Sequence, residues 1–154
     1  MRLYHGTTHE FEIPDPACGR EATDFGVGFY TTDSEHMADD WHKDEPGKHI
    51  NVYEITLNRI ESCNLRILRY ETADVSWAKF VYNNRKRRPN KAKFDIVIGP
   101  LADNSLNKWF DKIDNGQITW EELAAKINYR SYNSLQYCFK TSKSIKLLEY
   151  AYRK

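Results

Sequence analysis

The sequence has little of what would place it in several common classes of protein. No apolar run comes near the roughly 20 residues that a membrane-spanning helix needs, and the N-terminus, MRLYHGTT, contains no apolar signal core. These two absences predict a cytoplasmic protein that does not bind membranes. The three cysteines, Cys18, Cys63 and Cys138, lie far apart and form no C-x-x-C pair. A disulfide framework and a structural zinc site are therefore disfavoured, and we expect no metal.

An excess of charge of one sign is also missing. The chain has 23 lysines and arginines against 22 aspartates and glutamates, which gives a formal net charge of +1. This balance, with a hydrophobic content of 40%, disfavours a uniformly basic nucleic-acid binder and a disordered chain. The stretch from Arg85 to Lys93 nevertheless holds six lysines and arginines. It is either a solvated surface or a patch for RNA, DNA or an acidic partner.

The pattern of apolar residues predicts an α+β protein. The length of 154 residues favours a single domain over residues 1–154. Apolar and β-branched stretches predict strands at 2–6, 28–32, 50–57, 63–70, 94–99 and 135–139. Helical spacing and capping residues predict helices at 33–45, 72–85, 104–113, 119–127 and 142–151. Because strands and helices do not alternate regularly, we predict two small packed sheets with peripheral helices rather than a doubly wound parallel sheet.

Two of these helices carry more specific signals. In the helix at 72–85, Val75, Ala78 and Tyr82 fall at the spacing of a core-facing stripe. At the start of the helix at 119–127, Thr119 and Glu122 stand at the spacing of a capping box.

His5 stands out among the histidines because of its place in the first predicted strand. The period of two puts Leu3 and His5 on one face, so the imidazole points toward a partly buried region. It is either a core histidine with an internal partner or a hydrogen-bonding group for a ligand hydroxyl. In the second case Gly6 would let the ligand approach the backbone closely.

A glycine-rich turn precedes the second predicted strand. Gly26 and Gly28 allow positive φ and leave space along the backbone. The ring of Tyr30 beside such a turn is suited to stacking on a flat cationic ring, such as the nicotinamide of NAD. The alternative is a hairpin followed by ordinary core aromatics.

The strand at 135–139 separates apolar from polar side chains. Leu135, Tyr137 and Phe139 share one face, while Gln136 and Cys138 share the other. If the apolar face enters the core, Gln136 faces solvent, as a surface amide, or faces a cleft.

Five segments together resemble the ADP-ribosyltransferases of the His–Tyr–Glu class, the lineage of diphtheria toxin and the poly(ADP-ribose) polymerases. More closely, the chain resembles the bacterial DUF3990 family. The matching segments, which cover nearly the whole chain in the right order, are LYHGT (3–7), DFGVGFYTT (24–32), WAKFVYNNR (77–85), FDIVIGPLAD (94–103) and QYCF (136–139). The resemblance implies an ADP-ribosyltransferase-like split β-sandwich and NAD as the substrate.

The resemblance also implies roles for individual residues in binding NAD. His5 would bond a hydroxyl of the nicotinamide-side ribose, the Gly6 backbone would bond the nicotinamide amide, and Tyr30 would stack on the nicotinamide ring. Arg20 would meet the pyrophosphate, since a guanidinium suits paired phosphate oxygens, and Asp24 would face the adenosine side or Arg20. The remaining implied contacts line the floor and the ribose, and they are Thr7, Gly26, Gly28, Phe29 and Thr31 or Thr32.

The chemistry implied is cleavage of the nicotinamide glycosidic bond and transfer of ADP-ribose to RNA, DNA or protein. His5, Tyr30 and Gln136 would form the catalytic set. Gln136 stands where the class usually has a glutamate, and an amide cannot act as a general base. Three consequences are then possible. The acceptor is already a good nucleophile, or the acidic residue Asp103 does the work of the missing glutamate. In the third case the domain binds NAD without efficient transfer. Asp103 as a helix cap is an equally good explanation.

The resemblance further implies a setting and leaves alternatives. We expect an effector of a toxin–antitoxin or phage-defence system. An antitoxin protein, if the system has one, would cover the cleft between His5 and Tyr30. The alternatives are a catalytically weak module that binds NAD or ADP-ribose, and an enzyme like the RNA 2′-phosphotransferases.

Overall fold

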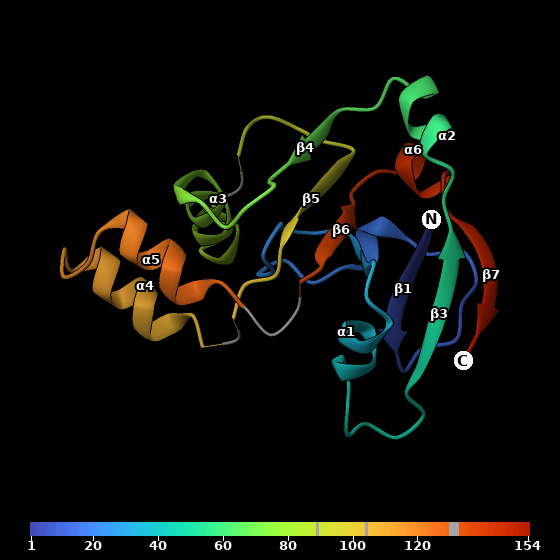
Figure 1. The fold of residues 1–154 in the computed structure, drawn as a ribbon, viewed down its shortest axis with the longest axis horizontal. Coiled ribbons are helices and arrows are strands. Elements are labelled where there is room, and N and C mark those ends of the chain that lie inside the picture. Colours follow the sequence, from blue (N-terminus) through green and yellow to red (C-terminus); the bar gives the residue numbers. More distant parts are fainter. Residues whose placement is uncertain (89, 104, 130–132) are drawn as a thin grey trace.

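The computed structural model of the chain describes residues 1–88, 90–103, 105–129 and 133–154 (Figure 1). Its described strands join in one seven-stranded sheet, in the order β4-β5-β6-β2-β1-β3-β7. Neighbouring strands are antiparallel except for the parallel pair β4 and β5. The strands are β1 (Arg2–Thr7), β2 (Phe29–Thr32), β3 (His49–Glu54), β4 (Ile67–Arg69), β5 (Ile96–Pro100), β6 (Leu135–Phe139) and β7 (Glu149–Arg153).

The sheet is nearly divided between β1 and β2. The β2–β6 ladder runs from Phe29 to Thr32 and the β1–β3 ladder from Arg2 to Thr7, but β1 and β2 share the single registered pair Tyr4–Thr32. We expected two packed sheets, and the strands instead form one hydrogen-bonded sheet with a weak seam. The coarser prediction, a mixed α/β protein, is confirmed.

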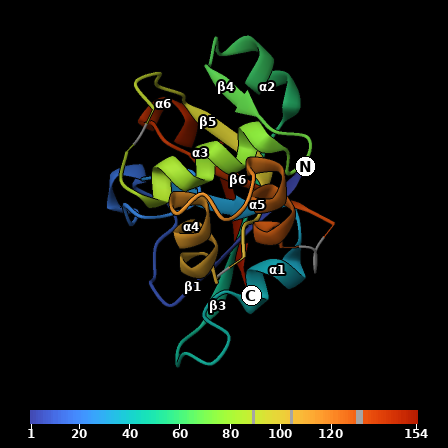
Figure 2. The ribbon, with the colours of Figure 1, turned by 90° about the vertical axis from the view of Figure 1, so that its left-hand side faces the viewer.

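The helices are mostly shorter than predicted. They are α1 (Glu35–Asp40), α2 (Leu57–Ser62), α3 (Val75–Arg85), α4 (Asn107–Asp114), α5 (Trp120–Ile127) and α6 (Ser142–Ile145), with a 3-10 turn η1 (Pro16–Cys18). Figure 1 places α3, α4 and α5 together at the end of the molecule opposite β7, and Figure 2 shows them in front of the sheet. None of the helices in the described ranges is both long and apolar enough to cross a membrane.

Two apolar clusters lie on the two sides of β5 and β6. On one side, α3, α4 and α5 pack with Phe25, Val97 and Cys138. On the other, the side chains from β1, β2, β3, β5 and β6 include Leu3, Phe29, Tyr53, Ile96 and Phe139. Both faces of β5 are therefore covered, which explains its nearly continuous apolar sequence.

Several predicted elements were wrong in extent or type. The strand predicted to reach residue 57 ends at Glu54, and α2 begins at Leu57. The helix predicted at 142–151 ends at Ile145, and Glu149–Arg153 forms the edge strand β7 beside β3. The stripe predicted on α3 is shifted, since α3 buries Trp77, Ala78, Phe80, Val81 and Asn84. In each case contacts between elements of the folded protein decide the structure, against the preference of the local sequence.

The capping box of α5 provides a test of local stability. The Thr119 hydroxyl accepts a hydrogen bond from the Glu122 N–H, and the Glu122 carboxylate accepts one from the Thr119 N–H. We expect Thr119→Ala to lower the free energy of unfolding by about 1 kcal/mol, because the cap is lost. Thr56 caps α2 without a side-chain hydrogen bond. Thr56→Ala is therefore the matched control, and equal losses in urea unfolding of the two variants would contradict the assignment.

Candidate functional site

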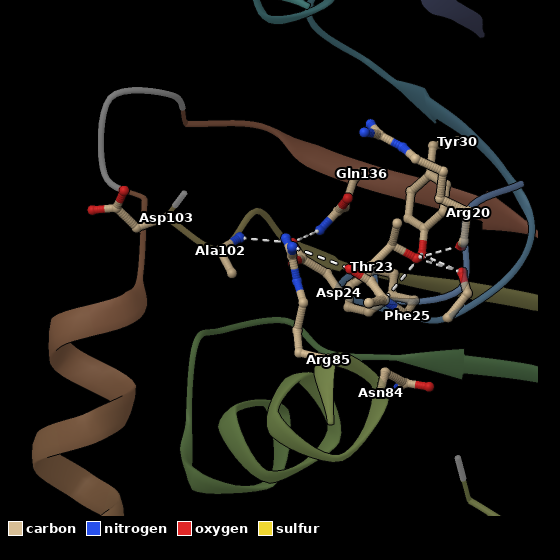
Figure 3. Close-up of polar contacts among 12 residues, drawn as sticks. Arg20, Thr23, Asp24, Phe25, Tyr30, Asn84, Arg85, Ala102, Asp103 and Gln136 are labelled. Carbon is tan, nitrogen blue, oxygen red and sulfur yellow. Dashed lines mark hydrogen bonds and ion pairs between the residues drawn. The ribbon is translucent and has the colours of Figure 1, made fainter. Parts of the chain in front are cut away.

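The centre of the candidate site is the buried carboxylate of Asp24, which is 3% exposed (Figure 3). Its Oδ1 accepts hydrogen bonds from Nε and Nη2 of Arg85, at 2.9 and 2.5 Å. Its Oδ2 accepts one from the Ala102 N–H at 3.0 Å and one from Nε2 of Gln136 at 2.8 Å. A buried carboxylate is tolerated only with a full set of donors, and this set supplies four.

This network brings together segments that are far apart in the sequence. Asp24 precedes the glycine-rich turn, Arg85 ends α3, Ala102 follows β5 and Gln136 lies in β6. The carbonyl of Pro100 accepts further hydrogen bonds from Nε2 of Gln136, at 3.2 Å, and from Nε1 of Trp77 on α3, at 3.0 Å. Four of the five segments quoted for the family resemblance thus meet at one buried group.

Gln136 is not a surface amide. It is 2% exposed, and its amide nitrogen is bonded to Asp24 and Pro100. Of the two alternatives left open for this residue, the surface amide is excluded, because α3, α4 and α5 cover the second face of β6. The amide nitrogen holds the carboxylate of Asp24 in place, and neither group is a free base.

The hydroxyl of Tyr30 is fixed inside the protein. It donates to the Gly26 carbonyl at 2.6 Å, receives a hydrogen bond from the Phe25 N–H at 3.0 Å and lies 2.9 Å from the Thr23 hydroxyl. Burial raises the pKa of this phenol well above its usual value. The Tyr30 ring stacks on Phe25, with centroids 6.4 Å apart. The phenol therefore stays neutral and serves to hold the turn.

Lys140 fixes the same turn from the other side. Its ammonium group donates to the carbonyls of Phe25 and Val27, at 2.6 and 2.7 Å. Burial lowers the pKa of Lys140. Gly26 has φ of 77°, the left-handed region that favours glycine. Together with Tyr30, Lys140 binds the carbonyls of residues 25 to 27, so the turn is rigid.

His5 lies at the seam between β1 and β2. Its Nδ1 is 2.6 Å from the Tyr30 carbonyl, which can only accept, so Nδ1 carries the proton and Nε2 keeps its lone pair. Burial lowers the pKa of the imidazole from 6.5 to about 4, so His5 is neutral near pH 7. The rings of Phe29, Phe11 and Trp41 surround it at centroid distances of 4.4, 5.8 and 6.1 Å.

The other residues expected to contact NAD from the first two strands are held by packing or by hydrogen bonds within the protein. A Cβ at Gly6 would come within 2.1 Å of the Ala38 carbonyl oxygen of α1, so only glycine fits there. The Thr7 hydroxyl accepts from the His9 N–H, and the Thr31 hydroxyl donates to the Tyr137 carbonyl. Gly28 and Phe29 are buried. Packing alone therefore accounts for Gly6 and Thr31.

Arg20 and Asp103 lie outside the Asp24 network (Figure 3). Arg20 is exposed. In the described part of the chain its side chain forms no hydrogen bond or ion pair. Asp103 accepts a hydrogen bond from the Ser105 N–H at 3.3 Å, just before α4. The interpretation of Asp103 as the cap of this helix was wrong, because the N-cap of α4 is Leu106 and no side chain forms a cap hydrogen bond there. Arg20 has a free guanidinium.

Two cavities open near the network. One, of about 330 Å³, lies between the end of α1 and the segment after β5, and its lining includes Met37, Trp41 and Ala102. A larger one, of about 570 Å³, is lined by residues that include Asp33, Glu71 and Pro100. Both border Tyr129. Trp41 and Ala102 connect the smaller cavity to His5 and to Asp24.

The sequence-based reasoning missed several residues of this arrangement. Arg85 was assigned to the basic run, while Phe11 and Lys140 received no role. The N-R ending of the third matching segment was a usable signal for Arg85, since an arginine that ends a helix can reach a buried carboxylate. No sequence signal pointed to Lys140, because its partners are backbone carbonyls.

The geometry defines a mixed α/β protein whose separated segments meet at a buried ion pair, and Tyr30 links the turn that follows Asp24 to a neutral histidine. The chain belongs to the family described as "protein of unknown function (DUF3990)", whose model matches residues 1–150. This confirms the resemblance to the DUF3990 family, and the resemblance to the ADP-ribosyltransferases stays a prediction. No curated protein and no solved structure matches the chain.

The Asp24–Arg85 pair gives a direct test of the network. We expect Arg85→Ala to lower the free energy of unfolding by about 3 kcal/mol, because it leaves a buried carboxylate without its cation. Adding Asp24→Asn to Arg85→Ala should recover part of the loss. Arg88 is an exposed residue three positions further on, and Arg88→Ala should change stability by less than about 0.5 kcal/mol. Equal losses for Arg85→Ala and Arg88→Ala in urea unfolding would rule the network out as a major source of stability.

The lowered pKa of His5 predicts a pH dependence. The unfolded chain binds this proton near pH 6.5 and the folded chain near pH 4, so the stabilisation is complete above 6.5 and is lost as the pH falls toward 4. Between pH 7 and pH 5 the loss is about 2 kcal/mol. His5→Gln can donate to the same carbonyl but does not titrate, so its unfolding free energy should fall less over this range. Parallel pH profiles for the two proteins would contradict the assignment.

Proposed function

We propose that this chain is an NAD-dependent ADP-ribosyltransferase whose single sheet, divided at the weak β1–β2 seam, corresponds to the split β-sandwich of that class, with His5 in the nicotinamide end of its site. The main support is the state of His5. Its Nδ1 is committed to the Tyr30 carbonyl and its imidazole is neutral, so Nε2 is a hydrogen-bond acceptor for a ribose hydroxyl. The seam at Tyr4–Thr32 lies beside it, and aromatic rings enclose it.

The rest of the proposed site follows from the residues around this histidine. The free guanidinium of Arg20 suits the NAD pyrophosphate. The turn from Gly26 to Gly28, held by Tyr30 and Lys140, supplies a rigid wall that costs little to organise on binding. Asp24 and Gln136 act as positioning residues in this proposal, because their polar groups already bond each other.

In the proposed reaction the bond between the anomeric carbon and the nicotinamide nitrogen breaks, and nicotinamide leaves with the electron pair. The acceptor atom of RNA, DNA or a protein forms the new bond to that carbon and releases its proton to solvent. The positive charge that develops on the ribose favours an enclosed site that keeps water out. We further propose that the protein is a cytoplasmic toxin–antitoxin or phage-defence effector.

A second candidate function is a module that binds NAD or ADP-ribose without efficient transfer. The observation that favours it is the state of Gln136, whose amide nitrogen is fully used within the protein. An amide in place of the usual glutamate supplies no general base for an acceptor.

The experiment is release of nicotinamide from labelled NAD, with and without RNA, DNA and cell lysate. We expect His5→Ala to abolish release. We expect Arg20→Ala to raise KM for NAD about 10- to 100-fold, since a hydrogen bond to a charged group contributes about 1.5–3 kcal/mol. Arg20 is exposed, so its substitution should leave the unfolding curve unchanged.

Arg88→Ala is the matched control, because it removes an exposed arginine outside the proposed site. Label retained on one macromolecule, and lost in His5→Ala, would support transfer. NAD binding by calorimetry without any release would support the binding module. Unchanged release in both the His5 and the Arg20 variants would contradict the proposed site.

A further inference from the structure

Helices α4 and α5 carry a surface that the proposed reaction does not use. Trp109 of α4 is half-buried, and the ammonium groups of three lysines surround its indole ring. The Nζ atoms of Lys108, Lys112 and Lys126 lie 4.9, 4.9 and 5.2 Å from the ring centroid. Lys108 and Lys112 are one turn apart on α4, and Lys126 comes from α5. These four residues are called the Trp109 patch.

The charge of the Trp109 patch is not neutralised by ion pairs. All three lysines are exposed, and across the described ranges none of them forms an ion pair. The acidic Asp114 of the same helix binds Lys86 and the Tyr82 hydroxyl instead. Attraction to the indole face offsets part of the repulsion among the three ammonium groups. The patch is therefore a compact positive site around one aromatic ring.

The chemistry of the patch fits a flat, anionic and extended ligand. An indole is a stacking platform for any nucleobase, and lysines bind backbone phosphates as point charges. A protein partner would need a desolvated apolar centre at its interface. The exposed large hydrophobic residues of the described ranges are Met1, Ile13, Ile67 and Tyr152, and none of them lies on α4 or α5.

We propose that the Trp109 patch binds single-stranded nucleic acid. One base takes the place of the ammonium groups on the indole, and the three exposed lysines turn to the flanking phosphates. Figures 1 and 2 place α4 and α5 at one end of the molecule, where an extended strand can pass. The binding goes beyond the proposed transfer and does not depend on it, since it needs no NAD. If both proposals hold, the strand on this patch is the acceptor class.

The test is fluorescence anisotropy of a short labelled oligouridine, measured without NAD over about 50 to 200 mM salt. Each phosphate contact on a single strand contributes about 0.7 to the slope of log affinity against log salt. The triple variant Lys108→Gln, Lys112→Gln and Lys126→Gln should therefore reduce this slope by about 2. Trp109→Leu should weaken binding about tenfold, within the range measured for base stacking, while Trp109→Phe should keep most of the affinity.

The matched control is the triple variant Arg88→Gln, Lys91→Gln and Lys93→Gln. It changes the net charge by the same amount, and these residues are also exposed. We expect this control to bind the oligouridine with the affinity of the native chain. Thermal unfolding of Trp109→Leu tests that this variant remains folded. The proposal is overturned if the native chain does not bind, if the control loses as much affinity, or if folded Trp109→Leu binds as well as the native chain. Equal affinity for polyglutamate would also overturn it, because the patch would then bind any polyanion.

Discussion

The buried carboxylate of Asp24 is the interaction on which the arrangement of this molecule depends. A carboxylate that is 3% exposed has lost its hydration. Removing any one of its hydrogen-bond donors would therefore lower the free energy of unfolding strongly. Its donors come from the end of α3, from the backbone after β5 and from β6. The network therefore fixes the positions of these three segments and of the glycine-rich turn relative to one another. A change in any of them disturbs the others.

Tyr30 connects this network to His5. Its hydroxyl is bound to the turn that follows Asp24, while its backbone carbonyl is bound by His5. The imidazole lies at the seam where β1 and β2 share the single registered pair Tyr4–Thr32. The tautomer of His5 thus follows from the position of the Tyr30 carbonyl, while its neutral state follows from burial, which lowers the pKa of the imidazole. Packing of α1 on Gly6 fixes the same end of β1, since no side chain fits there.

Much of this could be predicted from the sequence, and the reasons for the failures are physical. The strands at 28–32 and 135–139 and the capping box at Thr119 are local patterns, and the structure has β2, β6 and α5 at these places. The burial of Gln136 depends on helices that cover the second face of β6, which alternation along one strand cannot reveal. Strand β7 was predicted as part of a helix, and it forms a strand because β3 offers an edge for pairing. Arg85 stood in a run of positive charge, and only the fold shows that it pairs with Asp24.

The most direct test of the proposed NAD site is the nitrogen-15 NMR spectrum of the histidine side chains during a titration with NAD. There are five histidines, so the signals of His5 can be assigned with His5→Gln. At pH 7 we expect His5 to show a protonated Nδ1 and an unprotonated Nε2, and we expect the Nε2 signal to shift as NAD hydrogen-bonds to it. A spectrum in which His5 carries its proton on Nε2, or does not respond to saturating NAD, would contradict the account.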